Sequence, residues 1–320
     1  MRKLYALALA GTLSILAYGQ QETLPAITAT IGEAQFLGTS PAVRNLKENL
    51  VMNAIQVRDE NGVRWAEGRR PQSPAAPAFG PASIKDDPVL QSNMSQANMA
   101  LQAALGANFN GMGFTNVNPP DPSVAVGPNH VIQMINGSSG AYFRIYDKTG
   151  TPLNNQTYLD NLTGRGGLGD PIVLYDQLAD RFVMTEFANR SETGSEGLVV
   201  AVSATADPLG AWHVYYFSTG TTFPDYPKFS VWPDAYYATS NDFANASSYN
   251  GSSVYAFDRS RMLAGLPVTS FQTVKFSTTS FTKYFAMCPV LLQGTATPPA
   301  GTGGPIAYMF YDSWTSTTAH

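Results

Sequence analysis

The chain has little charge for its length. Lysine, arginine, aspartate and glutamate make up 13% of its 320 residues, about half of the roughly 25% that is usual in soluble domains. With 19 basic residues against 23 acidic ones and only three histidines, it lacks the clustered positive charge that binding DNA or RNA requires. We therefore expect no nucleic-acid partner.

Cysteine and the common catalytic motifs are also scarce. The single cysteine, Cys288, cannot form an intramolecular disulfide, so packing must stabilise the fold. It lies in the apolar stretch 285–291, where we expect it to be buried as a small hydrophobic residue. The sequence contains no HExxH zinc motif, Gly-x-Ser-x-Gly elbow, P-loop or Rossmann fingerprint. These absences argue against zinc, serine-hydrolase and nucleotide sites.

The first 19 residues have the pattern of a secretory signal peptide. Met1-Arg2-Lys3 precedes a short apolar run, and Ala17 and Gly19 provide small residues before a cleavage point. That run is shorter than the roughly 20 residues needed to cross a bilayer. We expect a secreted chain, extracellular or periplasmic, with no membrane span after cleavage. In such a chain, triplets such as Asn136-Gly137-Ser138 are candidate glycosylation sites.

Residues 20–108 have a mixed composition. Leu46, Leu50 and Ala54 recur at helical spacing, as do apolar residues over 90–105. Between them, residues 69–81 are rich in proline and alanine, which favours an extended linker. We expect a leader segment that is partly helical and partly disordered.

From residue 109 onward, short runs rich in Val, Ile, Tyr and Phe alternate with turn residues, which is typical of many short strands. A similar start recurs four times, at Asp121-Pro122, Asp170-Pro171, Asp225-Tyr226-Pro227 and Cys288-Pro289. Four strands per repeat of this size is the pattern of a β-propeller blade. We predict an all-β, partial β-propeller over 109–320, with about three and a half four-stranded blades. Because an open propeller exposes strand edges, we also expect it to be truncated, with further blades downstream.

Three motifs resemble a family of large secreted bacterial proteins with a propeller-like repeat domain. They are Asn118-Pro119-Pro120-Asp121-Pro122-Ser123, Gly169-Asp170-Pro171-Ile172-Val173 and Asp225-Tyr226-Pro227-Lys228. The resemblance covers about residues 109–312. It implies secretion and a propeller, but no catalytic residue, because the family has no established activity.

The repeated aspartates Asp121, Asp170 and Asp225 are the first candidate site. The first strand of each blade lines the central channel, so these carboxylates would converge on the axis. Carboxylates so close together require a neutralising charge. Lys228 could supply it, or a calcium ion bound by the three aspartates could. Alternatively, each aspartate caps a turn through local backbone amides.

The stretch from Asp121 to Val131 is also similar, more weakly, to the strand that carries the general base in five-bladed arabinanase-type glycosidases. Glycoside hydrolysis needs two carboxyl groups flanking the scissile bond. This resemblance implies Asp121 as base and Glu186 as acid, with Asp170 tuning them. The recurrence of Asp-Pro in the next repeat favours a structural element instead.

Aromatic side chains near the third repeat start are the remaining candidates. Tyr226, Trp232 and Tyr236 could stack on sugar rings beside Lys228, although most aromatic residues in strands fill the core. We predict a binding protein for polysaccharide or a surface glycoconjugate. The alternatives are a secreted glycoside hydrolase and a structural scaffold for downstream domains. Whether the chain is an enzyme stays open, with binding favoured.

Overall fold

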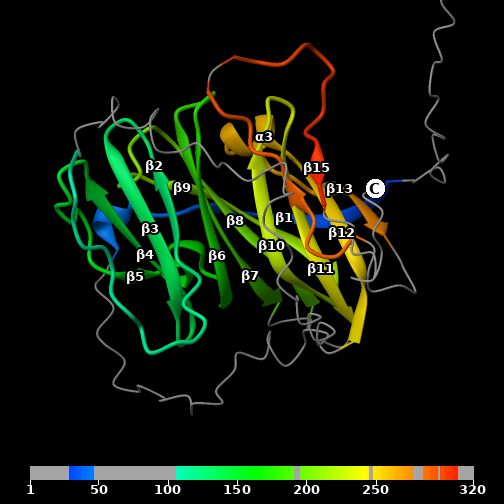
Figure 1. Ribbon diagram of the computed structural model, residues 1–320, viewed down its shortest axis with the longest axis horizontal. Helices are drawn as coiled ribbons and strands as arrows, with labels where there is room; N and C mark the ends of the chain where they lie inside the picture. The colour runs from blue at the N-terminus through cyan, green and yellow to red at the C-terminus, as the bar shows by residue number, and fades with distance from the viewer. Residues whose placement is uncertain are drawn as a thin grey trace, which may run out of the picture.

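The computed structural model describes residues 29–46, 106–190, 195–244, 248–276, 284–294 and 296–308. Within these residues the chain is all-β, as the sequence predicts (Figure 1). The signal peptide and, apart from Leu46, the two predicted leader helices lie outside them. None of the described helices is both long and apolar enough to cross a membrane.

Four antiparallel sheets follow one another along the chain, and within each one every strand pairs with the next. Sheet one contains β2 (Ser123–Val126), β3 (His130–Gly137), β4 (Gly140–Asp147) and β5 (Thr157–Tyr158). Sheet two contains β6 (Gly167–Asp176), β7 (Arg181–Arg190), β8 (Ser195–Ser203) and β9 (Trp212–Gly220). Sheet three contains β10 (Thr222–Val231), β11 (Ala235–Ala244), β12 (Ser248–Asp258) and β13 (Ser270–Phe276). Sheet four contains β14 (Cys288–Pro289) and β15 (Ile306–Ala307).

Helices serve only as short connections in the described residues. They are η1 (Val43–Asn45), α2 (Leu159–Thr163) and α3 (Arg259–Leu263). The Asp258 side chain caps α3 by accepting a hydrogen bond from the backbone N–H of Arg261 at 3.0 Å, which satisfies an amide that the helix leaves without a partner.

Sheet two is buried on both faces because it lies between sheet one and sheet three. In β8, Leu198, Val200 and Val202 pack into a core shared with sheet three, whereas the alternating residues Val199 and Ala201 face a core shared with sheet one. Side chains alternate between the two faces of a strand. The continuous apolar run in β8 is therefore the sequence requirement for a sheet with a neighbour on each side.

Strand β1 (Thr30–Thr39) lies within the segment predicted as a leader, and the sequence did not indicate it. Its first part pairs with β13 and its second part with β9. It therefore joins sheets two and three into one nine-stranded sheet. In Figure 1 this strand is the blue segment that passes behind the yellow and green strands.

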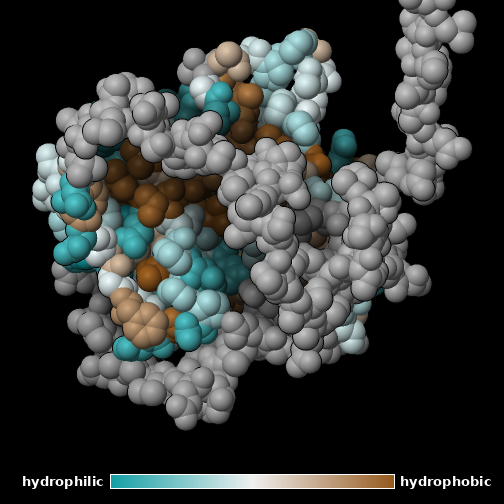
Figure 2. All heavy atoms as spheres, in the orientation of Figure 1, coloured by the Kyte–Doolittle hydropathy of each residue, from teal (hydrophilic) through white to brown (hydrophobic). Residues whose placement is uncertain are grey.

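The first strands of the sheets lie next to one another. β6 contacts both β2 and β10, and β10 contacts β14. On the face seen in Figure 2, apolar residues gather over β2 and its neighbours, where Val124 and Val126 are more than half exposed. The contacts among β2, β6, β10 and β14 thus bring together residues from distant parts of the sequence.

Candidate functional site

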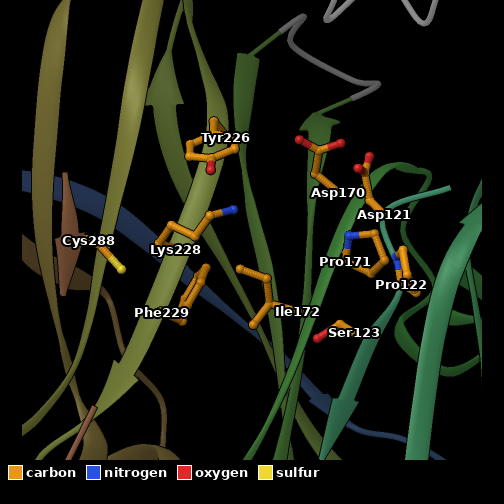
Figure 3. Close-up of a pocket in the computed structure, with 10 residues that line it drawn as sticks. All are labelled: Asp121, Pro122, Ser123, Asp170, Pro171, Ile172, Tyr226, Lys228, Phe229 and Cys288. Carbon is orange, nitrogen blue, oxygen red and sulfur yellow. The ribbon is translucent and has the colours of Figure 1, made fainter. Parts of the chain in front are cut away.

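A pocket of about 470 Å³ lies along the first strands of all four sheets (Figure 3). Each sheet contributes to its lining. The lining residues are Asp121, Pro122, Ser123, Asp170, Pro171, Ile172, Tyr226, Lys228, Phe229 and Cys288. In Figure 3 the carboxylates of Asp121 and Asp170 lie side by side and point the same way, and the Lys228 side chain extends toward them from β10. The volume is within the range of small-molecule sites, roughly 300 to 1,000 Å³.

The first strand of each sheet has, within it or just before it, one residue with an uncommon backbone conformation. Asp121, Asp170, Tyr226 and Ala286 have φ values of 38°, 49°, 52° and 55°. Few residues other than glycine adopt a positive φ, and bulky side chains such as that of Tyr226 do so rarely. In β6 and β10 this residue lies inside a β-bulge. Such strain persists where the surroundings enforce it, and it clusters at functional sites.

This conformation corrects the repeat alignment expected from residue types. In the third sheet the residue before proline is Tyr226, and Asp225 lies one position earlier. Asp225 is 1% exposed and does not line the pocket. In the fourth sheet the equivalent residue is Ala286 rather than Cys288. The structure therefore brings together two of the three predicted aspartates, Asp121 and Asp170.

Asn136 fixes the positions of these two aspartates. It lies in β3 and is completely buried. Its Nδ2 donates hydrogen bonds to Asp121 Oδ2 at 2.6 Å and to the Pro119 carbonyl at 3.0 Å. Its Oδ1 accepts a hydrogen bond from the backbone N–H of Asp170 at 3.0 Å. One amide thus connects the acids of two sheets, a role that the glycosylation triplet at Asn136 does not indicate.

Lys228 and Tyr226 form the opposite wall. The Lys228 ammonium lies 3.7 Å from the centre of the Tyr226 ring, and Nζ donates to the Pro227 carbonyl at 3.2 Å. Burial lowers the pKa of Lys228, while the carboxylates of Asp170 and Asp121 act in the opposite direction. This wall offers one positive charge and a partly exposed aromatic face.

Cys288 lies in the same pocket and is exposed, contrary to the expectation that it would be buried. The next residue back, Met287, is 3% exposed. Alternation along the strand therefore sends Met287 into the core and Cys288 outward. An apolar run in the sequence predicts that the segment is packed, but not which of its side chains face the pocket.

Glu186 lies away from the pocket, between sheets one and two. It is completely buried in β7, and its Oε2 accepts hydrogen bonds from the N–H groups of Ala141 at 2.9 Å and Gly169 at 3.1 Å. Burial, and then the neighbouring Asp160 carboxyl group, raises the pKa of Glu186 well above its usual value. Burial also raises the pKa of Asp160 to about 6. The structure does not bring Glu186 together with Asp121.

Two aromatic candidates also lie away from the pocket. Tyr236 is 1% exposed, and its hydroxyl donates to Asp176 Oδ2 at 2.9 Å. Trp232 is 6% exposed, and its Nε1 donates to the Val290 carbonyl at 2.7 Å. Of the four predicted ligand-binding residues, Tyr226 and Lys228 line the pocket, and Trp232 and Tyr236 do not.

No group of three or more His, Cys, Asp or Glu side chains within the described ranges is arranged to hold a metal ion. The expected set of three aspartates is incomplete because Asp225 lies outside the pocket. Lys228 already provides a positive charge near the remaining two.

Neither a protein-family model nor a curated protein matches this chain. Among solved structures, it is weakly similar to a GH43 endo-arabinanase from Bacillus licheniformis, at 12% identity over 48% of this chain and 54% of that one, with a TM-score of 0.31. A GH43_1 enzyme from Xanthomonas citri is similar at 14% identity over 47% and 58%, with a TM-score of 0.30. A thermostable family-43 glycoside hydrolase is similar at 15% identity over 54% and 60%, with a TM-score of 0.31. The chain thus spans between half and three fifths of these proteins. Similarity at this level carries no argument about function.

Proposed function

We propose that sheets one to four are successive blades of a β-propeller and that the chain binds a saccharide in the pocket along their first strands. The observation that carries this proposal is the composition of the pocket, which joins two carboxylates, an ammonium group and an aromatic ring from three sheets. The order of the strands within each sheet and the contacts between the first strands support the propeller. We also propose export, on the basis of the predicted signal peptide.

The chemistry of the two walls suits a polyhydroxylated ligand. The carboxylates of Asp121 and Asp170 can accept hydrogen bonds from sugar hydroxyls, and charged acceptors make stronger hydrogen bonds than neutral ones. Tyr226 is 37% exposed, so its ring can contact the apolar face of a sugar. Lys228 can donate to a ring or hydroxyl oxygen. Asn136 holds the Asp121 carboxylate and the Asp170 backbone in fixed positions before the ligand arrives, which reduces the entropy lost on binding.

Binding is favoured over hydrolysis because the pocket lacks an obvious acid. Hydrolysis requires one carboxyl group that donates a proton and another that acts as base or nucleophile. Glu186, the predicted acid, is buried between two sheets and engaged by backbone amides. The carboxyl groups that line the pocket are those of Asp121 and Asp170, and the resemblance supplies no acid among the lining residues.

The Lys228 ammonium group bears on the calcium hypothesis. Lys228 is largely buried near Asp121 and Asp170, and it provides the neutralisation that three aspartates would otherwise require. We propose that Lys228, rather than a bound cation, balances the pocket. Adding a chelator should then leave the melting temperature of the chain unchanged.

The proposal is tested by screening the full chain against plant and bacterial polysaccharides and measuring affinity by calorimetry. Asp121→Asn and Asp170→Asn should each weaken binding by about tenfold or more, because each removes a charged acceptor. The matched control is Asp234→Asn in the turn between β10 and β11, since Asp234 is exposed and does not line the pocket.

Each other outcome selects an alternative. Release of sugar products that is lost in Asp121→Asn would establish a hydrolase using the pocket aspartates. Failure to bind any saccharide would favour a scaffold. Binding that survives both pocket substitutions would place the site elsewhere.

A further inference from the structure

The outer edges of sheets two and three share one added strand. Thr30–Glu33 of β1 pairs with Ser270–Thr273 of β13, and Ala34–Thr39 pairs with His213–Phe217 of β9. Each of these sheets already has four strands of its own. A strand edge offers a row of backbone donors and acceptors to any extended chain that fits. β1 therefore occupies the groove between the paired edges of β9 and β13.

The side chains of β1 fit this groove specifically. Gly32 lies against the ring of Phe271, so closely that a side chain at this position would collide with the ring. Phe36 packs on Tyr215 with ring centres 5.0 Å apart. The main-chain pairing would accept many sequences, whereas these two positions select for glycine and an aromatic residue.

Contacts beyond the strand extend the docked segment to residue 46. The Ser40 hydroxyl oxygen accepts a hydrogen bond from the Trp212 N–H at 3.0 Å. Val43 is 4% exposed and belongs to the core between sheets one and two. Arg44 forms an ion pair with Asp207. The partners lie more than 160 residues later in the sequence. The segment is thus held by contacts with residues that are far away in the sequence.

We propose that the groove between β9 and β13 is a strand-docking site whose occupant is residues 29–46, and that the same segment of a second copy of this chain can replace it. Recognition follows the strand-addition mode, in which backbone hydrogen bonds provide affinity and selected side chains provide specificity. Exchange of an identical element between copies is a low-cost route to dimers, because it keeps every contact. This inference does not depend on the proposed saccharide site.

The test uses the full chain and a fluorescent synthetic peptide of residues 29–46. The wild-type chain should capture the peptide slowly, as its own segment leaves the groove. A chain carrying Gly32→Val should capture about tenfold more wild-type peptide, because overpacking against Phe271 weakens its own segment. A peptide carrying Gly32→Val should not bind. The matched control is a peptide carrying Ile31→Thr, since Ile31 is 71% exposed, and it should bind like the parent.

Two results would overturn the proposal. One is equal capture of the parent and Gly32→Val peptides, which would show that the groove is not the binding surface. The other is absence of capture by a folded Gly32→Val chain. If that variant does not fold, Phe36→Ala replaces it, because it removes a contact without introducing a collision. Concentration-dependent dimers of the wild-type chain that the parent peptide dissociates would support exchange between copies.

Discussion

The buried carboxyl groups on the two faces of sheet two have different partners. Toward sheet one, Glu186 accepts two backbone hydrogen bonds beside a second acid, Asp160. Toward sheet three, Asp176 accepts hydrogen bonds from Arg259 Nε at 2.7 Å and Nη2 at 3.0 Å. Burying a carboxylate is costly unless its charge is compensated. In the second contact a guanidinium compensates the charge, whereas in the first contact burial and the neighbouring acid raise the pKa of Glu186 and so favour its protonated form.

These two sheet contacts therefore respond differently to pH and to substitution. Where burial raises the pKa of an acid, the folded chain loses stability as the pH rises. A pair of opposite charges is insensitive to pH near neutrality but fails when one partner is removed. Substitution and pH therefore separate the two contacts.

The largest effect is expected from Arg259→Met. It would leave Asp176, which is completely buried, without its cation. Removing one partner of a buried ion pair costs about 3–5 kcal/mol. Urea unfolding should show a loss of this size. Arg261→Met, two residues away and exposed, is the control and should lose less than about 1 kcal/mol. Equal losses in the two variants would contradict the role given to the ion pair.

An intermediate effect is expected from pH. The folded-state pKa values of Glu186 and Asp160 are raised, Asp160 to about 6, so the folded chain holds protons that the unfolded chain releases. The free energy of unfolding should therefore fall as the pH rises from about 4, the ordinary carboxyl value, through 6 and beyond.

Glu186→Gln should flatten this dependence, because the amide oxygen still accepts from Ala141 and Gly169 but carries no charge. At pH 8 the variant should be more stable than the wild type, because it holds no proton that must be lost, and at pH 4 the two should be similar. Chemical denaturation across this range is the measurement. The raised pKa of Glu186 would be contradicted if the free energy of unfolding of the wild type rose between pH 5 and 8 and that of the Gln variant rose in the same way.

The smallest effect comes from two equivalent asparagines. Asn241 in β11 accepts from the N–H of Ala286 at 2.8 Å, as Asn136 accepts from the N–H of Asp170. Either change to Ala should cost about 1 kcal/mol by removing the hydrogen bonds of a buried asparagine side chain. Only Asn136→Ala should also weaken saccharide binding, because only Asn136 contacts a pocket aspartate. Equal binding losses in both variants would mean that the loss reflects stability alone.

Much of the strand pattern could be predicted from sequence. Runs rich in Val, Ile, Tyr and Phe, bounded by turn residues, predict strands over 172–175, 181–187, 198–203 and 212–217. All four lie within the observed strands β6 to β9. Their boundaries are set by turn residues nearby in the sequence, which local patterns report. Strand β1 could not be found this way, because its partners lie up to 243 residues away.

The site was only partly predictable for a related reason. Asp121 and Asp170 stand out because Asp-Pro recurs, whereas Tyr226 and Ala286 share their backbone conformation but not their side-chain type. The hydrogen bonds of Asn136 depend on the packing of two sheets, which no short motif records. Alignment by residue type matches Asp225 and Cys288 to the two aspartates, whereas alignment by backbone conformation matches Tyr226 and Ala286 to them.

The position of Cys288 offers a direct way to observe the pocket. Because the chain has one cysteine and it lines the pocket beside Lys228 and Phe229, a thiol-reactive fluorophore would attach at a single place without any engineered substitution. Its emission would respond to whatever displaces water from the surrounding walls. The unaltered chain thus carries its own attachment point for an optical sensor of occupancy.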